Sequence, residues 1–163
     1  MPSRIALFAG TFDPVTLGHL DVVRRASSLF DQLVVAVART GKATLFSADE
    51  RVSLLTENVR PFANVRVVPF DGLLVEVARR EGASVLLRGV RTIEDWEYEL
   101  RMMEMNRHLA PTLETLFLAP SVAYAFVASS LVREVSALGG DVAGLVPPNV
   151  SRALKAKSPL ADR

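Results

Sequence analysis

The stretch IALFAGTFDPVTLGHLDVVRRASSLF, residues 5–30, predicts a strand, a loop and a helix in succession. Residues 5–9 form an apolar run of strand length, and residues 20–30 repeat apolar side chains at helical spacing. The join between them, 10–19, carries two glycines, a proline, two threonines and a histidine. Taken alone, such residues are explained as turn formers. A plain strand-to-helix turn needs fewer of them, so the join is also a candidate site.

The same alternation continues along the chain. Helical patterns separate the apolar runs; one opens on the capping-box pair Ser47 and Glu50, and another ends at Gly82. The strand-like runs are mostly continuous, which is typical of sheets covered on both faces. We therefore predict an α/β fold, a single-domain, Rossmann-like, doubly wound sheet of five parallel strands. The four further strands are expected at 33–38, 65–68, 84–87 and 115–119.

Composition bounds the class of protein. A chain of 163 residues, half of them hydrophobic, suits one domain over 1–163, with a tail at 155–163 that we expect to fray. The formal net charge of +1 gives little attraction to nucleic acid or anionic membrane, so neither partner is expected. The chain has no cysteine, which excludes disulfide and thiolate chemistry. No secretory signal or membrane-length apolar run is visible, and we expect a cytoplasmic protein.

Unusual residues follow every predicted strand. Ligands of parallel α/β sheets bind outside the carboxyl ends of the strands, so these segments should meet at one edge. They supply donors and positive charge without an evident nucleophile or a cluster with metal-ligand spacing, which favours direct phosphoryl or nucleotidyl displacement without a protein-held metal. The residues that we expect at this edge are Thr11, His19, Lys42, Arg88, Arg91, Ser129 and Ser130.

Each of these residues also has a simpler interpretation. Lys42 could be a solvated loop residue, and Arg88 and Arg91 could form surface ion pairs with the acidic residues after them. The two serines 129 and 130 could simply cap a helix. Tyr124 could belong to the core. Only their convergence on one edge favours a shared binding site.

A family resemblance rests on motifs spread along the chain. GTFDPVTLGH resembles the first loop of the nucleotidylyltransferase superfamily, with Thr16-Leu17-Gly18-His19 matching its [HT]-x-G-H motif. Four further segments follow in order, and together they make residues 4–157 resemble the bacterial phosphopantetheine adenylyltransferase family. These segments are RGVRTIEDWEYE (88–99), MNRHL (105–109), LETLFLAPS (113–121) and SSLVREV (129–135).

The resemblance implies an activity and its partners. ATP and 4′-phosphopantetheine would give 3′-dephospho-CoA and pyrophosphate by in-line attack on the α-phosphate, with Mg²⁺ carried by the ATP phosphates. Coenzyme A would act as a feedback inhibitor in the same pocket, and the chain would form a homohexamer.

It also implies particular residues. His19 would stabilise charge at the α-phosphate, Thr11 would orient the attacking phosphate, and Lys42 would bridge the phosphates of both substrates. Arg91 would complete this catalytic set. The residues implied for ATP are Gly10, Thr11, Phe12, His19, Gly89, Arg91, Glu99, Tyr124, Ser129 and Ser130. Those implied for phosphopantetheine are Thr11, Lys42, Leu74, Arg88, Met105 and Asn106.

Several positions depart from the family pattern. Ala9 stands where proline is common, Leu17 where asparagine is common, and Ala128 where serine is common. The loop that carries Lys42 reads RTGK (39–42) instead of the usual Asn-Pro-x-Lys. None of these changes removes His19 or either arginine of the edge, so we expect activity to survive.

Three other functions remain as alternatives. Another nucleotidylyltransferase, acting on nicotinamide mononucleotide or glycerol phosphate, shares the first loop but is disfavoured by segments 88–99 and 105–109. A class I aminoacyl-tRNA synthetase fragment is disfavoured because the chain lacks a KMSKS-like loop and a basic extension. A nucleotide-binding module without catalysis would bind ATP without needing His19 for turnover.

Overall fold

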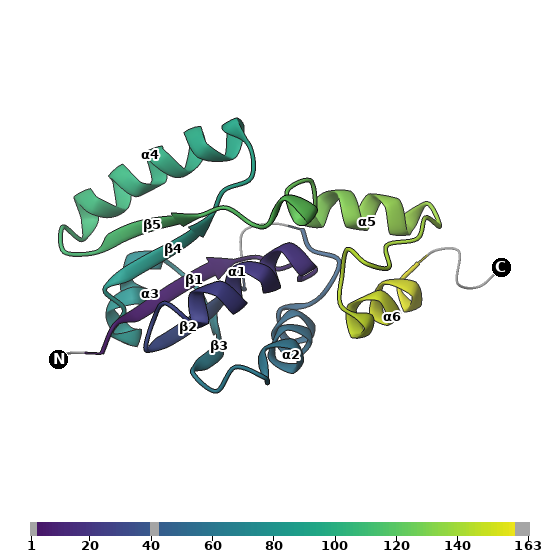
Figure 1. Ribbon diagram of the computed structural model, residues 1–163, viewed down its shortest axis with the longest axis horizontal. Coiled ribbons are helices and arrows are strands. Elements are labelled where there is room, and N and C mark those ends of the chain that lie inside the picture. The colour runs from purple at the N-terminus through teal and green to yellow at the C-terminus, as the bar shows by residue number, and fades with distance from the viewer. Residues whose placement is uncertain (1–2, 40–42, 159–163) are drawn as a thin grey trace.

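The computed structural model describes residues 3–39 and 43–158. Its five strands form one parallel sheet in the order β3-β2-β1-β4-β5 (Figure 1). The strands are β1 Ile5–Gly10, β2 Gln32–Ala38, β3 Val65–Phe70, β4 Val85–Gly89 and β5 Glu114–Leu118. The helices are α1 Leu17–Ser27, α2 Ala48–Val59, α3 Leu74–Glu81, α4 Ile93–Leu109, α5 Ser129–Ala137 and α6 Pro148–Ala156, with a 3-10 turn, η1, at Val122–Tyr124. The predicted five-stranded, Rossmann-like α/β fold is confirmed.

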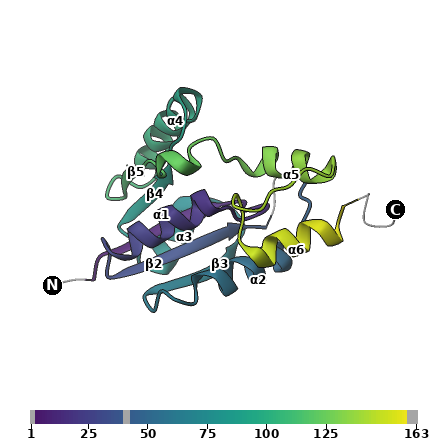
Figure 2. The same ribbon diagram turned by 45° about the vertical axis from the view of Figure 1, so that its right-hand side comes forward.

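Helices cover both faces of the sheet (Figures 1 and 2). On one face, alternate strand residues such as Phe8 and Val35 pack in a core that also contains residues of α1, α2, α5 and α6. On the other face, Leu7 and Leu86 pack with residues of α3, among them Val75. Side chains alternate along a strand, so two separate apolar cores require the continuous apolar runs that the sequence shows.

Helix α4 lies beside β5, on the face that α3 covers, and leaves apolar side chains in solvent. The Trp96 ring packs edge-on against Phe117 of β5, with ring centroids 4.8 Å apart. Ile93, the first residue of α4, remains 77% exposed. We call the exposed apolar side chains of α4 and β5 the α4–β5 surface; they are Ile93, Trp96, Tyr98, Met105, Leu109 and Leu116.

Some of the helix ends lie at the residues that the sequence predicted. Ser47 and Glu50 form the predicted capping box of α2, and Gly82 ends α3 with φ of 68°. The interpretation of Ser129 as a helix cap is wrong, because Ala128 occupies the N-cap position and makes no side-chain bond. The Ser129 hydroxyl instead donates to the carbonyl oxygen of Pro14.

The expectation that residues 155–163 fray is wrong for its first residues. Residues 155 and 156 belong to α6, a helix that the sequence patterns did not predict. Val150 and Leu154 bury one face of this helix in the core, which holds it in place. The Lys157 ammonium pairs with Glu50 of α2 at 3.0 Å. Residues 159–163 lie outside the described residues.

Candidate active site

One cavity of about 380 Å³ lies at the carboxyl ends of β1 and β4, beside the first turn of α5. Most of the residues that the sequence placed at this edge line it, although they come from segments far apart in the chain. Lys42 lies outside the described residues. The predicted site residues that line the cavity are Gly10, Thr11, Phe12, His19, Arg88, Gly89, Arg91, Glu99, Ser129 and Ser130.

His19 is held by the residue that caps its own helix. Thr16 is the N-cap of α1; its side chain accepts from the His19 backbone N–H at 3.3 Å, and its own N–H donates to His19 Nδ1 at 3.0 Å. A backbone N–H can only donate, so Nδ1 accepts and the neutral ring carries its proton on Nε2. Burial, and secondarily the charge of Arg91, lower the pKa of His19 from 6.5 to about 4. At neutral pH this side chain is therefore a neutral hydrogen-bond donor at the cavity.

Phe12 supports His19 from one side. Its ring is 3% exposed and packs edge-on against His19, with centroids 5.0 Å apart, and against Phe8 at 5.5 Å. Phe12 has φ of 50°, a conformation that costs energy in a residue other than glycine. A Cβ on Gly10 would lie 3.2 Å from this ring. Gly10 therefore makes room for Phe12, in addition to bordering the cavity.

The arginines of the cavity are paired with carboxylates. Arg88 donates to both carboxylate oxygens of Glu99, at 2.7 and 2.6 Å, and to the carbonyl oxygen of Ala9 at 2.9 Å. Arg91 donates to Asp95 at 3.1 Å and to the Val127 carbonyl oxygen at 2.9 Å. These bonds fix the orientation of each guanidinium and still leave N–H groups for a phosphate.

Helix α5 is docked on the first loop. The Ser129 hydroxyl donates to Pro14 O at 2.8 Å, and Arg133 donates to the carbonyl oxygen of Asp13 and lies 3.4 Å from its carboxylate. The N-cap of α5, Ala128, offers no side-chain acceptor. The first N–H groups of the helix therefore have no side-chain cap, and such a terminus favours anions.

Four predicted residues do not line this cavity. Tyr124 lies in η1 and packs against the core and the start of α1. Leu74, the first residue of α3, is partly buried against the core, Met105 is 54% exposed on α4, and Asn106 is buried on α4. The residues implied for the pantetheine arm, and Tyr124 implied for the adenine, therefore lie outside the lining of this cavity.

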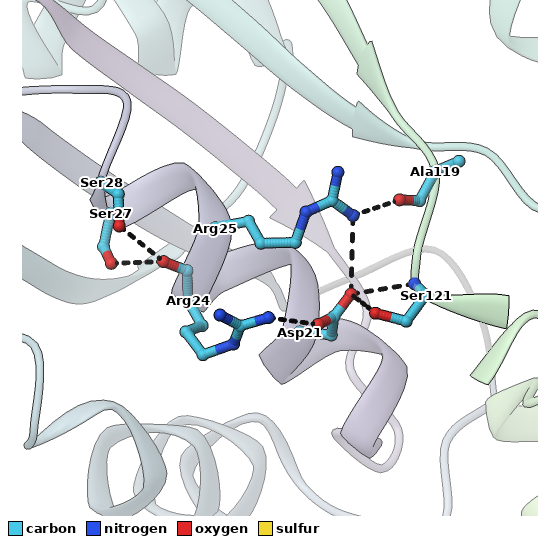
Figure 3. A network of polar contacts seen from close by, with 7 residues as sticks. All are labelled: Asp21, Arg24, Arg25, Ser27, Ser28, Ala119 and Ser121. Atoms are coloured by element: carbon cyan, nitrogen blue, oxygen red, sulfur yellow. Dashed lines mark hydrogen bonds and ion pairs between the residues drawn. The ribbon is translucent and has the colours of Figure 1, made fainter. Parts of the chain in front are cut away.

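A polar network anchors the segment between β5 and η1 (Figure 3). Asp21 of α1 accepts the backbone N–H and the hydroxyl of Ser121 at 2.9 and 2.8 Å, and a bond from Arg24 at 2.9 Å. Arg25 donates to the carbonyl oxygen of Ala119 and lies 3.6 Å from the same carboxylate. Burial of Asp21 raises the pKa of its carboxyl, but the bonds from Ser121 and Arg24 outweigh this effect and lower it from 3.8 to about 2.

Sequence reasoning missed residues whose importance lies in long-range contacts. Asp13, Asp95 and Arg133 line the cavity, and Arg51, which does not line it, donates to the carbonyl oxygen of Thr11. The only sequence signal for Asp13 was its place in the unusual first loop. No local pattern distinguishes Arg51 from a surface helix residue.

The described residues contain neither a candidate metal cluster nor a membrane-spanning helix. Within residues 3–39 and 43–158, no group of three or more His, Cys, Asp or Glu side chains is placed to hold a metal ion. None of the helices in the same ranges is long and apolar enough to cross a membrane.

Known proteins share both the sequence and the fold. The chain matches a family model described as cytidylyltransferase-like over residues 7–135. A phosphopantetheine adenylyltransferase from Azoarcus sp. (strain BH72) is 51% identical over 96% of this chain and 97% of that protein. One from Thioalkalivibrio sulfidiphilus (strain HL-EbGR7) is 53% identical over 94% of this chain and 97% of that protein. The chain belongs to the phosphopantetheine adenylyltransferase family.

The fold extends beyond this family. A candidate nicotinate-nucleotide adenylyltransferase from Vibrio parahaemolyticus superposes with a TM-score of 0.69 at 15% identity, over 95% of this chain and 93% of that one. At such identity the likeness shows a shared fold only. The assignment to the phosphopantetheine adenylyltransferase family therefore rests on the sequence relatives.

The departures from the phosphopantetheine adenylyltransferase pattern lie at backbone contacts. The Leu17 N–H donates to the carbonyl oxygen of Leu145 at 2.9 Å, a bond that any residue except proline can make. Ala9 contributes its carbonyl oxygen to Arg88. Ala128 leaves the start of α5 without a side-chain cap. The substituted loop at 40–42 lies outside the described residues.

Proposed function

We propose that this chain transfers the adenylyl group of ATP to 4′-phosphopantetheine, giving 3′-dephospho-CoA and pyrophosphate. The observation that carries the proposal is the placement of His19, Arg88 and Arg91 around one cavity, in a chain about half identical to proteins with that name. A phosphate oxygen of phosphopantetheine attacks the α-phosphorus, and the bond to the β-phosphate breaks. This oxygen carries negative charge at neutral pH, so no side chain needs to act as a base.

His19 stabilises the charge that develops on the α-phosphate. Its Nδ1 accepts from Thr16, so Nε2–H is the donor left for an α-phosphate oxygen. A donor that is already oriented needs no reorganisation in the transition state, and one such donor typically contributes about 10²–10³ in rate.

Positive charge and helix N–H groups bind the remaining phosphates. Arg88 holds the acceptor phosphate through the N–H groups that Glu99 and Ala9 leave unused, and Arg91 holds the phosphates of ATP. The Ser129 hydroxyl already donates to the Pro14 carbonyl oxygen, so α5 binds the β- and γ-phosphates through its backbone N–H groups. Lys42 bridges both substrates in this proposal.

The remaining contacts involve the two organic groups. Gly89 and Tyr124 contact the nucleotide. Glu99 acts through Arg88, because both of its carboxylate oxygens accept hydrogen bonds from that guanidinium. Leu74, Met105 and Asn106 contact the pantetheine arm. Mg²⁺ enters as part of the MgATP substrate. A cytoplasmic location fits an enzyme that consumes ATP.

An acceptor screen tests the reaction. The protein is incubated with MgATP and, separately, phosphopantetheine, nicotinamide mononucleotide or glycerol phosphate, and pyrophosphate release is followed. We expect release with phosphopantetheine, together with dephospho-CoA identified by mass. A reaction without an acceptor and one with His19→Ala protein are the controls. Pyrophosphate released only with nicotinamide mononucleotide would assign the chain to that reaction instead.

We further propose a homohexamer and inhibition by coenzyme A. The α4–β5 surface exposes several large apolar side chains, which is typical of a surface covered by another subunit. Light scattering should give six times the mass of the 163-residue chain, and a stable monomer would contradict this. Coenzyme A should raise the KM for phosphopantetheine without lowering kcat, as expected of ligands that share a pocket.

A further inference from the structure

Arg51 is a buried cation that pairs with carbonyl groups. The residue is only 2% exposed and lies near the N-terminus of α2, where the helix dipole disfavours a positive charge. Within the described part of the chain, its hydrogen bonds go to backbone carbonyl oxygens and none goes to a carboxylate. Burying an ionised group is costly unless its bonds replace the lost hydration. We therefore expect the Arg51 guanidinium to have a role besides packing.

The three carbonyl groups come from three separate segments. One terminal nitrogen of Arg51 donates to Thr11 O and Ala38 O, both at 2.7 Å, and Nε donates to Phe46 O at 3.1 Å. Ala38 ends β2, and Phe46 precedes the cap of α2. One guanidinium thus joins the first loop to both ends of the segment 39–45.

Asp13 fixes the same segment from the other side. Its two carboxylate oxygens accept the backbone N–H groups of Leu45 at 2.8 Å and Phe46 at 2.9 Å. Phe46 is therefore held through its N–H by Asp13 and through its C=O by Arg51. Ser47 already caps α2, so Arg51 is not needed as a helix cap.

We propose that Arg51 is a positioning residue for the acceptor phosphate. The inference rests on the proposed function and on the role that the family resemblance implies for Thr11, which is to orient the attacking phosphate. Thr11 lines the cavity, whereas Arg51 does not, so Arg51 acts through the Thr11 backbone and through the ends of segment 39–45. Its charge also adds positive potential beneath the loop that receives a phosphate.

The guanidinium is required for its shape as well as its charge. A planar fork reaches three carbonyl groups in different directions, whereas a lysine ammonium is a compact charge on a flexible stem. Arg51→Lys keeps the charge and removes the fork. A small shift of a positioned substrate can reduce turnover by about 10²-fold.

Steady-state kinetics of Arg51→Lys test the proposal, with each substrate varied at saturation of the other. We expect kcat/KM for phosphopantetheine to fall by about tenfold or more, and KM for ATP to change by less than about threefold. The reason is that, of the residues implied for ATP, Arg51 bonds only the backbone carbonyl group of Thr11, and none of its bonds goes to Arg91, Gly89 or α5. Arg60→Lys is the matched control, because Arg60 is exposed at the other end of the same helix and should behave as the wild type.

A second measurement separates positioning from folding. Thr11→Ala, Arg51→Lys and the double variant are compared in kcat/KM for phosphopantetheine, with Tm recorded for each protein. Positioning through Thr11 predicts effects that are clearly less than multiplicative in the double variant. Multiplicative effects, or an equal loss for both substrates that follows Tm, would overturn the inference and leave Arg51 as a purely structural residue.

The result for the wild type identifies which proposal fails. If the wild type is active with phosphopantetheine and Arg51→Lys is equally active, only the assignment of Arg51 as a positioning residue is overturned. A wild type that releases no pyrophosphate with phosphopantetheine overturns the proposed function, and the inference falls with it.

Discussion

Thr16 and His19 hold each other in one orientation at the start of α1. The Thr16 N–H donates to His19 Nδ1 at 3.0 Å, and the His19 N–H donates to Thr16 Oγ1 at 3.3 Å. The spacing of three residues between them is that of a capping box, in which histidine takes the place usually filled by glutamate or glutamine. The same bonds that begin the helix also orient the imidazole that lines the cavity.

Thr16→Val should reduce both stability and turnover. Valine keeps the shape but cannot accept the His19 N–H, and loss of such a cap costs about 1 kcal/mol of unfolding free energy. We expect a lower kcat, because the imidazole loses the contact of its Nδ1 with Thr16 Oγ1 at 3.1 Å and keeps only the bond from the Thr16 N–H. Thr16→Ser retains the hydroxyl and is the matched control. Denaturant unfolding and initial rates check the prediction, and a Thr16→Val protein with wild-type kcat would contradict it.

His19→Ala should lower kcat far more than it lowers ATP affinity. Removal of one oriented donor typically costs about 10²–10³ in rate. His108→Ala removes the only other histidine, which is exposed on α4, and should be neutral. Rates of pyrophosphate release and the Kd for ATP provide the comparison. Equal losses in both quantities would make His19 a binding residue.

The imidazole of His19 should remain neutral through the neutral pH range. Its folded pKa of about 4 lies below the ordinary 6.5, so the folded protein binds this proton less readily than the unfolded chain. The free energy of unfolding should therefore decrease as the pH falls from 6.5 through 4. NMR of the ring protons, assigned with the His19→Ala variant, should show no titration of this residue between pH 6 and 8. A midpoint near 6.5 would refute the donor assignment.

Asp21→Asn should remove stability that depends on pH. The folded pKa of about 2 lies below the ordinary 3.8, so the carboxylate contributes stability above pH 3.8 and loses it as the pH falls through 2. The shift corresponds to about 2 kcal/mol at neutral pH. Unfolding curves of the wild type and variant should therefore differ at pH 7 and converge toward pH 2.

Asp31→Asn provides the control for this substitution. Asp31 also pairs with an arginine, Arg4, but both side chains are at least half exposed, so that the effect should be small. A difference between Asp21→Asn and wild type that is independent of pH would show that the packing around Ser121, rather than the charge, supplies the stability. The network in Figure 3 would then anchor η1 by shape alone.

Local patterns predicted most of the fold. The apolar run at residues 5–9, the Ser47 cap and the Gly82 stop each depend on neighbouring residues, so a reader of the sequence can recognise them. Helix α6 was missed, because no side-chain cap marks its start and it is held by the contacts of Val150 and Leu154 in the core. The position of the cavity at one edge of the sheet was also predicted, since the carboxyl ends of parallel strands lie at the same edge.

Sequence motifs predicted which residues form the site, but they did not predict the hydrogen-bond partners of those residues. Arg88 and Arg91 were expected to meet phosphates, and the structure adds the carboxylates that orient them, Glu99 and Asp95. Ser129 was interpreted as a cap because it stands at a helix start. Its hydroxyl bonds a carbonyl group 115 residues away, which no local pattern could indicate.

Local sequence patterns thus predicted the five strands, every helix except α6 and the edge at which the first loop lies, because hydrophobic periodicity and caps act over a few residues. The side chains that hold that loop became visible only in the folded molecule. Arg51 reaches Thr11 across 40 residues and Arg133 reaches Asp13 across 120. These bonds exist because the folded sheet brings the ends of β1 and β2 beside α2 and α5, and burial makes each unpaired polar group costly.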